Sequence, residues 1–369
     1  MGETLGRPEL QSLKKYIPGK SIEEVQREYG LTEVIKLASN ENPLGSSPKA
    51  LAAMQAELAK VNLYPEPTCP DLTRELAAKV NLAPENILFG NGADGVLTIV
   101  AQAFVSAGDE AIFCPPTFVV YDQIVQVMGG VCRRVPMGHD FRYNVADIVR
   151  AITPKTKLII ICNPNNPTGT IVRKNEMNWL LEHVPPRAVV VLDEAYCDFV
   201  EDADYPDSLE YIRRGHNVIV LRTFSKIYGL AGVRIGYALS TPDLVDTMAK
   251  VRESFPVNRV AQAGARAALS DDEFRQRTLA VNRAGKRFLY ERFAELGLEF
   301  LPTEANFVFV NLGVDSREAF QRLLRLGVVV RPGFIWDLDN WARVTIGTQY
   351  DNEKFIAALE AVLRDLAAG

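Results

Sequence analysis

The sequence predicts an α/β protein with a large domain built on a mostly parallel sheet and a smaller α+β domain. Two observations support this prediction. Between residues 86 and 239, seven short apolar runs alternate with segments of helical spacing, a pattern typical of parallel strands joined by crossover helices. After residue 242 the helical stretches become long and the strands few, which indicates a second unit. A chain of 369 residues is long enough for both.

The first 47 residues are predicted to form an N-terminal arm and part of the small domain. A short helix is expected at 22–29, and a short strand starting at Ile35 leads into a turn-rich loop. The large domain follows, from 48 to 250. It opens with a helix at 48–60 that has a proline in its first turn, and a helix at 71–80 with Asp71 as its N-cap.

The large domain is expected to hold seven strands flanked by helices. We place the strands at 87–89, 111–114, 131–135, 158–162, 188–192, 218–221 and 235–239. Helices are expected between most of them, at 94–106, 118–128 and 174–183. The last strand follows its predecessor after a loop rather than a helix, so it is a candidate for an antiparallel return.

The small C-terminal domain is predicted to span residues 251–369. Long helices at 243–253 and 272–296 lead into it, and it ends with a helix at 353–366. Between these we expect strands at 307–311, 328–331 and 342–346 and a helix at 317–325. No internal repeat interrupts this order.

Composition restricts the functions that this chain can have. The net charge of −5 gives no broad basic field, so no nucleic-acid partner is expected. No apolar run approaches the length of a membrane span, and the N-terminus lacks a signal-peptide pattern. The five cysteines form no C-x-x-C pair, which fits a reducing cytoplasm. The three histidines show no metal-ligand spacing, so no metal is expected.

Polar and glycine-rich segments follow the predicted strands at the sheet edge where open α/β proteins bind ligands. The loop 90–95 has three glycines before a helix, and its backbone N–H groups can bind an anion or simply form a tight turn. Phe118 follows the next strand and can stack on a planar ring or pack in the core. The loop Asn163-Pro-Asn-Asn-Pro-Thr-Gly169 combines rigid prolines with three amide side chains.

An acid and an amine follow the next two strands. Asp193 ends a buried strand and needs a partner, which a protonated pyridine nitrogen would provide. Lys226 lies between hydroxyl residues and Arg234; alone it could be a surface lysine. A lysine amine forms a Schiff base with a carbonyl, and pyridoxal phosphate is an aldehyde that acts as an electron sink when its ring nitrogen stays protonated. The residues together therefore indicate a phosphate-bearing aldehyde cofactor.

These segments resemble the fold-type I pyridoxal-phosphate aminotransferases and, within them, the histidinol-phosphate aminotransferase group. The resemblance spans nearly the whole chain in the family's order. The matching segments are Tyr16-Ile-Pro-Gly-Lys, Ser39-Asn-Glu-Asn-Pro-Leu-Gly, Tyr64-Pro, Gly90-Asn-Gly-Ala-Asp, Pro115-Pro-Thr-Phe, Asn163-Pro-Asn-Asn-Pro-Thr-Gly, Asp193-Glu-Ala-Tyr, Phe224-Ser-Lys, Gly229-Leu-Ala-Gly-Val-Arg, Arg331-Pro and Arg343-Val-Thr-Ile-Gly-Thr.

The resemblance implies a role for each motif residue toward pyridoxal 5'-phosphate. Lys226 would form the Schiff base and Asp193 would pair with the pyridine nitrogen, while Tyr196 and Asn166 would hydrogen-bond the ring hydroxyl. Phe118 would stack on the ring; tyrosine is common there, so this site lacks that hydroxyl. The cofactor phosphate would be held by Ala93, Asp94, Thr223, Ser225 and Arg234.

The resemblance also implies a homodimer with shared active sites, because Tyr64 would reach the phosphate of the cofactor in the neighbouring subunit. Arg343 would bind the substrate anion, with Arg331, Asn42 and Tyr16 nearby. The implied reaction is transamination of L-histidinol phosphate with 2-oxoglutarate, an amino donor and a keto-acid acceptor, to give imidazole acetol phosphate and L-glutamate in histidine biosynthesis.

Three alternatives stay open from the sequence. An aromatic amino-acid aminotransferase of the same subgroup would carry identical cofactor motifs. A threonine-phosphate decarboxylase-like enzyme has a related sequence. A non-enzymatic, cofactor-binding regulator belongs to a different class, and the chain has no DNA-binding extension or basic patch to favour it.

Overall fold

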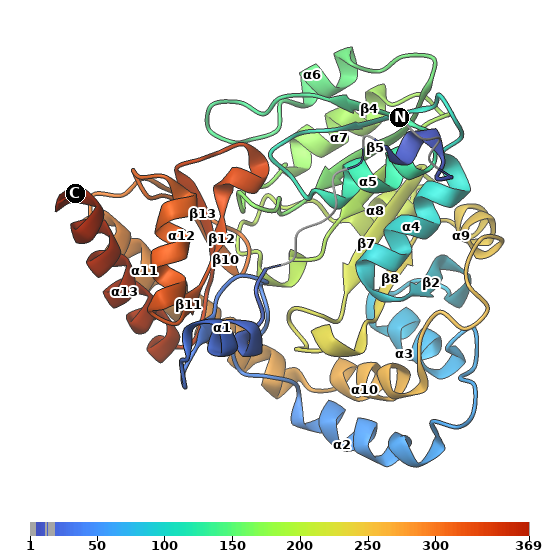
Figure 1. The fold of residues 1–369 in the computed structure, drawn as a ribbon. Helices are drawn as coiled ribbons and strands as arrows, with labels where there is room; N and C mark the ends of the chain where they lie inside the picture. Colours follow the sequence, from blue (N-terminus) through green and yellow to red (C-terminus); the bar gives the residue numbers. More distant parts are fainter. Residues whose placement is uncertain (1–4, 12, 14–18, 369) are drawn as a thin grey trace.

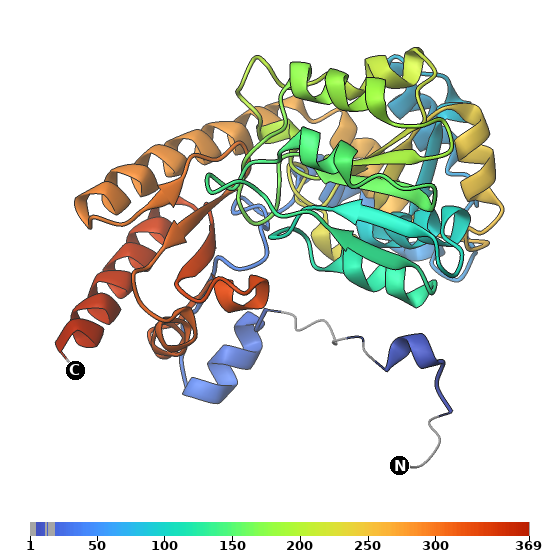
Figure 2. The ribbon, with the colours of Figure 1, turned by 90° about the horizontal axis from the view of Figure 1, so that it is seen from above.

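A computed structural model of the protein describes residues 5–11, 13 and 19–368. The chain forms a large domain and a small domain that lie side by side in both ribbon views (Figures 1 and 2). The N-terminal short helix η1 (Pro8–Leu10) lies against the large domain, whereas α1 (Ile22–Tyr29) belongs to the small domain. In the described part of the chain, no helix is long and apolar enough to cross a membrane.

A seven-stranded sheet forms the centre of the large domain, in the order β2-β8-β7-β6-β5-β3-β4. The strands are β2 (Ile87–Gly90), β3 (Glu110–Phe113), β4 (Val131–Arg134), β5 (Thr156–Cys162), β6 (Val189–Asp193), β7 (Val218–Thr223) and β8 (Gly236–Leu239). Strands β3 to β7 pair in parallel, and β8 runs antiparallel to both β2 and β7. The predicted mostly parallel sheet is confirmed, and its last strand does return antiparallel.

Both faces of this sheet are covered, which explains why its central strands β5, β6 and β7 are largely apolar, whereas the edge strand β4 carries Arg133 and Arg134. Alternate residues of β5 pack into different clusters: Leu158 and Ile160 face one core, and Ile159 and Ile161 face the other. The first core includes α4 (Gly92–Phe104), α5 (Val120–Val127) and α9 (Pro242–Ala249). The second includes α3 (Pro70–Val80), α6 (Val145–Arg150), α7 (Lys174–His183), α8 (Ser208–Arg213) and α10 (Arg259–Leu269).

The small domain combines two short sheets with helices of 8 to 24 residues. Its four-stranded sheet has the order β12-β13-β10-β9 and is built from β9 (Phe300–Leu301), β10 (Phe307–Asn311), β12 (Arg331–Pro332) and β13 (Trp341–Thr345). The N-terminal β1 (Ile35–Lys36) pairs in parallel with β11 (Val328–Val329). Besides α1, the helices are α11 (Asp272–Glu295), α12 (Ser316–Arg325) and α13 (Gln349–Ala368). This pairing of β1 with β11 places Ile35 and Lys36 beside a strand of the small domain.

The stretch around α10 differs from our predicted element pattern, which had no helix at 259–269. This helix packs against α2 (Pro48–Glu57) at the base of the large domain (Figure 1), and Arg259 forms an ion pair of 2.8 Å with Glu57. We therefore propose that the domain boundary lies after α10 rather than at residue 250. Asp271, whose carboxylate accepts a hydrogen bond from the backbone N–H of Phe274, then caps the helix α11 that leads into the small domain.

Candidate active site

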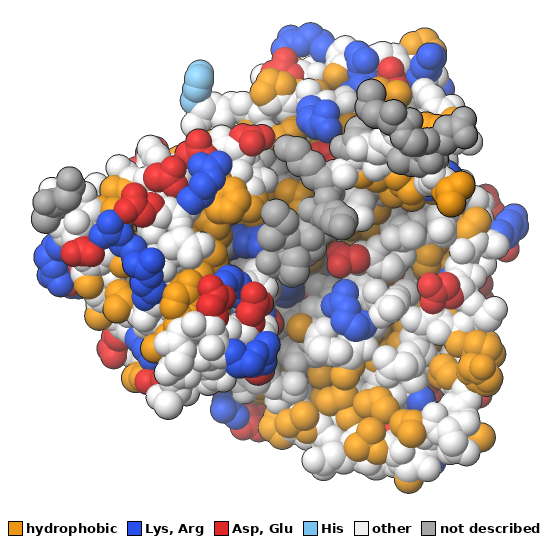
Figure 3. Space-filling view, in the orientation of Figure 1, with side chains coloured by type: hydrophobic (Ala, Val, Ile, Leu, Met, Phe, Trp, Pro, Cys, Tyr) orange, Lys and Arg blue, Asp and Glu red, His pale blue; other side chains and the backbone are white. Residues whose placement is uncertain are grey.

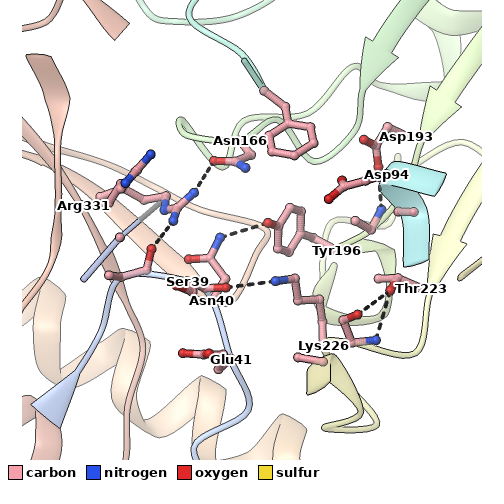
Figure 4. Close-up of a pocket in the computed structure, with 18 of the residues that line it drawn as sticks. Ser39, Asn40, Glu41, Asp94, Asn166, Asp193, Tyr196, Thr223, Lys226 and Arg331 are labelled. Atoms are coloured by element: carbon pink, nitrogen blue, oxygen red, sulfur yellow. Dashed lines mark hydrogen bonds between the residues drawn. The ribbon is translucent and has the colours of Figure 1, made fainter. Parts of the chain in front are cut away.

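A cavity of about 390 Å³ lies between the two domains, at the carboxyl ends of β5, β6 and β7. Figure 3 shows a hollow in the same region, and Figure 4 shows many of the lining side chains. The large domain contributes Ala93, Asp94, Phe118, Asn166, Asp193, Tyr196, Thr223, Ser225, Lys226 and Arg234. The small domain contributes Arg331, Ile335, Trp336 and Arg343, and the N-terminal segment contributes residues 38–41. The strand-end positions predicted from the sequence therefore converge on one site.

Lys226 follows β7 and extends into the cavity (Figure 4). Its Nζ donates a hydrogen bond of 3.0 Å to the backbone carbonyl of Ser39. Burial, together with the positive charge of Arg343, lowers the pKa of Lys226 to about 8. A substantial fraction of this amine is therefore neutral near physiological pH and able to act as a nucleophile or a base.

Asp193 ends β6 and is buried. It accepts hydrogen bonds from the hydroxyl of Tyr121 at 2.6 Å and from the backbone N–H of Ala195 at 3.2 Å. Burial raises the pKa of Asp193 to about 6, against the lowering effect of the Tyr121 hydrogen bond. Within the described chain, no lysine, arginine or histidine forms an ion pair with this carboxylate. The site thus offers a buried acid that suits a cationic nitrogen on a ligand.

Two neutral side chains present hydrogen-bond donors to the cavity. The Oδ1 of Asn166 accepts a hydrogen bond of 2.6 Å from Arg343, which leaves its amide nitrogen to donate. The hydroxyl oxygen of Tyr196 accepts a hydrogen bond of 2.9 Å from the Nδ2 of Asn40, so its own hydrogen is directed elsewhere. Two donors that face one cavity suit an anionic oxygen on the ligand.

A cradle of backbone and hydroxyl groups lies at the start of α4. Gly236 on β8 lies so close to this helix that a Cβ there would meet the backbone nitrogen of Ala93 at 2.6 Å. Ser225 accepts a hydrogen bond of 2.9 Å from the hydroxyl of Thr223 and keeps its own hydrogen to donate. Arg234 lies 3.6 Å from the carboxylate of Asp94, and both are about half exposed. A helix N-terminus with a hydroxyl and a guanidinium favours a phosphate.

Two arginines lie side by side on the small-domain wall of the cavity. Arg331 on β12 and Arg343 on β13 are directly opposite each other in the sheet, and both are more than nine-tenths buried. The guanidinium of Arg343 lies 5.5 Å from the ring centre of Phe307 and 5.7 Å from that of Trp336. Paired guanidinium groups bind carboxylates and phosphates strongly because their geometry permits bidentate hydrogen bonds.

Comparison with known protein families shows which family the chain belongs to. The sequence profile of aminotransferase class I and II matches residues 32–359. The chain belongs to the aminotransferase class I and II family. It is an aminotransferase that depends on pyridoxal phosphate.

Individual relatives agree with this assignment over almost the full length of the chain. The histidinol-phosphate aminotransferase of Moorella thermoacetica is 50% identical over 97% of this chain and 92% of its own length. The histidinol-phosphate aminotransferase 2 of Carboxydothermus hydrogenoformans is 44% identical, covering 98% of this chain and 99% of its own. The crystal structure of histidinol-phosphate aminotransferase from Sinorhizobium meliloti, solved with pyridoxal 5'-phosphate, matches with a TM-score of 0.91 at 30% identity and 99% coverage of both chains.

The cavity of this aminotransferase fits pyridoxal phosphate group by group. Lys226 would supply the amine for the aldehyde, and Asp193 would supply the carboxylate for the ring nitrogen. Asn166 and Tyr196 would supply donors for the ring oxygen. From the sequence, Phe118 could either stack on a planar ring or pack in the core. It lines the same cavity, and this position is compatible with stacking on the ring. We propose these roles because all five side chains line one cavity.

Two predicted site residues in the described part of the chain, Asn42 and Tyr64, do not line the cavity. The side-chain amide of Asn42 donates to the backbone carbonyls of Lys226 and Ile227, at 3.3 and 3.0 Å, so it holds the lysine loop and does not face the ligand. We therefore replace Asn42 with Asn40 in the proposed site. Tyr64 is 78% exposed on the surface, as a residue that serves a partner would be. Tyr16 lies outside the described residues.

Sequence reasoning missed three residues that shape the site. Asn40 and Tyr121 were read as turn and helix residues, because their partners Tyr196 and Asp193 are distant in sequence. Trp336 closes one wall, and its indole N–H donates to the backbone carbonyl of Thr117 at 3.0 Å. An isolated tryptophan carries no sequence signal for such a contact.

Proposed function

We propose that this aminotransferase transfers the amino group of L-histidinol phosphate to 2-oxoglutarate, forming imidazole acetol phosphate and L-glutamate in histidine biosynthesis. The observation that carries the proposal is the buried pair Arg331 and Arg343, facing the same cavity as the Lys226 amine. The names of full-length relatives that are 42–50% identical to the chain support this choice of substrate.

The arginine pair addresses the two substrates in turn. Histidinol phosphate carries a phosphate and no carboxylate, whereas glutamate and 2-oxoglutarate carry carboxylates. Because a guanidinium forms bidentate hydrogen bonds with either oxyanion, one pair can hold both classes. Two adjacent positive charges favour the dianionic phosphate over a single carboxylate.

Each residue of the site contributes a defined part of the chemistry. Bound pyridoxal phosphate supplies an electron sink that stabilises negative charge at the reacting carbon of the substrate. Lys226 Nζ removes the proton from the substrate carbon that bears the amino group, and a positioned base of this kind contributes roughly 10²–10⁴-fold in rate. Asp193 holds positive charge on the ring nitrogen, because a buried carboxylate favours a cationic partner. Trp336 and Ile335 cover the small-domain side and exclude water.

We also propose that the enzyme is a homodimer with shared active sites and that it works in the cytoplasm. Exposed apolar side chains gather near the end of α2, namely Leu58, Val61, Leu63 and Tyr64, and Figure 3 shows hydrophobic side chains collected over the lower face of the molecule. The ring of Tyr64 stacks on that of exposed Phe255 at 4.5 Å. Contiguous apolar surface of this kind marks protein interfaces. All five cysteines are free thiols, which supports a reducing compartment.

A half-reaction tests the substrate. The purified enzyme is loaded with pyridoxal phosphate, and single amino donors are added without a keto acid while the absorbance band of the bound cofactor is followed. We expect histidinol phosphate to abolish the band at least tenfold faster than phenylalanine, because two adjacent guanidinium groups attract a dianionic phosphate more strongly than a singly charged carboxylate, and about 1.4 kcal/mol corresponds to a factor of ten.

Arg343→Lys serves as the matched variant, because it keeps the charge and loses the planar fork. It should slow the reaction of both histidinol phosphate and glutamate while the band itself still forms. A preference for phenylalanine or tyrosine would reassign the enzyme to the aromatic amino-acid aminotransferases. Unchanged rates in Arg343→Lys would show that the oxyanion site lies elsewhere.

A further inference from the structure

Asn40 is a buried polar residue at the junction of the two domains. It lies just after β1, it is 1% exposed, and its backbone adopts a left-handed conformation with φ of 55°. Asparagine tolerates that conformation better than most residues. Its backbone carbonyl accepts a hydrogen bond of 3.0 Å from the side chain of Asn306. The position of Asn40 is therefore fixed by contacts with the small domain.

The orientation of the Asn40 side-chain amide is fixed by a second set of contacts. The backbone N–H of Asn40 donates to the Oγ1 of Thr345 at 2.9 Å. The same hydroxyl donates to the Oδ1 of Asn40 at 3.1 Å. Because Oδ1 takes the hydroxyl hydrogen, Nδ2 is the atom that faces Tyr196, and it donates to the Tyr196 hydroxyl at 2.9 Å. Figure 4 shows this contact beside Lys226.

The consequence concerns the single hydrogen of the Tyr196 hydroxyl. That hydroxyl already accepts from Asn40, which has no lone pair to offer in return through Nδ2. Burial raises the pKa of Tyr196, so the hydroxyl keeps its hydrogen near neutral pH. The side chain lines the cavity, and the O–H bond is left to donate there.

We propose that Asn40 is a positioning residue that orients the Tyr196 hydroxyl so that it donates to the ring oxygen of the bound cofactor. This inference rests on the proposed cofactor role of Tyr196. Hydrogen bonds run from Thr345 to Asn40 and from Asn40 to Tyr196. Thr345 lies two residues after Arg343 on β13, the strand proposed to bind the substrate anion. Tyr196 belongs to the large domain and is proposed to contact the cofactor.

The test uses Asn40→Asp, which has nearly the same shape and replaces the donor by an acceptor. The Tyr196 hydroxyl would turn toward the new carboxylate and no longer donate to the cofactor. Two quantities are measured without turnover: the equilibrium affinity of the apoenzyme for pyridoxal phosphate, and the pH midpoint of the absorbance band of the loaded enzyme. We expect the affinity to fall about tenfold or more. The midpoint should move to higher pH, because the ionised ring oxygen loses a donor.

Tyr196→Phe supplies the matched background. If Asn40 acts through Tyr196, then Asn40→Asp changes the affinity by less than about twofold in Tyr196→Phe, since the coupled pair is already broken. An equal effect of Asn40→Asp in both backgrounds would overturn the inference, because it would show that charge or packing acts directly. If Asn40→Asp does not fold, Asn40→Gly, which suits the positive φ, takes its place in the same cycle and should lower the affinity less.

The same cycle separates this inference from the function proposed above. If Tyr196→Phe alone changes neither quantity, the cofactor role of Tyr196 is wrong and the inference is overturned with it. If Tyr196→Phe changes both quantities while Asn40→Asp changes neither, only the role of Asn40 is overturned. The half-reaction with histidinol phosphate is independent of both results.

Discussion

Two charged residues in the cavity are held at a cost to the ligand-free protein. Burial moves the pKa of Lys226 down to about 8 and that of Asp193 up to about 6. The directions are opposite because burial disfavours the charged form of each group. A cofactor with a cationic nitrogen and an aldehyde relieves both, since it pairs with the carboxylate and consumes the amine. We therefore expect bound pyridoxal phosphate to relieve the electrostatic cost of both residues.

Asp193→Asn should make the apoenzyme more stable and the cofactor complex weaker. The folded state binds the Asp193 proton more tightly than the unfolded chain does, so this residue lowers stability as the pH rises from about 4 to about 6. The full cost, about 3 kcal/mol for a pKa of about 6 against the ordinary 3.8, is present above that range. Urea unfolding of the apoenzyme at about pH 7 should show most of this gain, with less at about pH 5.

Asp271→Asn is the control, because the opposite sign is expected there. Asp271 accepts hydrogen bonds from Ser47 and from the backbone N–H of Phe274, and these contacts hold its pKa below the usual value despite burial. Its ionised form is therefore stabilising, and its removal should destabilise the protein at neutral pH by roughly 1 kcal/mol. A loss of stability in both variants would contradict the account of Asp193.

Single residues also show where sequence reasoning stops. The motif 39–45 predicted an asparagine at the site, and the structure places Asn40, rather than Asn42, on the cavity. Both asparagines are buried or nearly so, and only the partners tell them apart: Asn40 contacts Tyr196 across 156 positions of sequence. Such contacts depend on the assembled fold. Lys226 and Asp193 were predictable because each lies at or shortly after the carboxyl end of an apolar strand.

At the scale of elements, the phosphate cradle depends on how closely β8 approaches the first turn of α4. Gly236→Ala tests this approach, because a Cβ there would meet the backbone of Gly92 and Ala93 at 2.7 and 2.6 Å. Neither contact involves a flexible side chain, so the strand or the helix must shift. We expect a loss of about 1–3 kcal/mol in unfolding free energy and weaker binding of pyridoxal phosphate, measured by denaturation and by titration of the apoenzyme.

Gly6→Ala controls for the effect of replacing a glycine as such, because nothing lies within 4 Å of the added atom and its φ is ordinary. It should leave unfolding and cofactor titration close to those of the parent protein. An unaltered affinity in Gly236→Ala would mean that the backbone of α4 does not hold the phosphate. A fall in stability without a fall in affinity would lead to the same conclusion.

Elements with a single strong periodicity were predictable, and those shared between sheets were not. The helix 22–29 and the strand 307–311 were predicted with their observed bounds. The predicted strand 328–331 is in fact two, because Val328 and Val329 pair with β1 whereas Arg331 pairs with β13. The local sequence pattern does not show that neighbouring residues of one extended segment pair with strands of different sheets. Helix α10 was missed although its buried alanines and Gly264 pack closely on α2.

At the scale of the whole molecule, the site exists only because two domains and the N-terminal segment meet. The sequence led us to predict two domains, with residues 1–47 as an arm and part of the small one, and these bounds stay a prediction. It did not predict the contacts that close the cavity, such as the indole of Trp336 on the carbonyl of Thr117. These contacts are set by the relative placement of the domains, and no periodicity in the chain encodes it.

A shared active site in a homodimer can be tested by mixing two inactive proteins. Lys226→Ala lacks the amine, and Tyr64→Ala lacks the group proposed to reach the partner's site. After unfolding and refolding together, the mixed dimer has one site with the Lys226 of one chain and the Tyr64 of the other. Half of the dimers are mixed and one of their two sites is intact, so activity should return to about a quarter of the parent value.

Lys226→Ala mixed with Asp193→Asn is the matched control, because both residues come from the same chain of any one site. Every site in that mixture keeps a defect, and no recovery is expected. Recovery of activity in the control would mean that mixing restores activity by some route other than an active site shared between subunits. No recovery with Tyr64→Ala, or full activity of Tyr64→Ala alone, would assign the exposed pair Tyr64 and Phe255 to packing between subunits or to the free surface. Tyr64 lies outside the cavity of its own chain and beside exposed Leu63. This position favours recovery of activity in the mixture of Lys226→Ala with Tyr64→Ala.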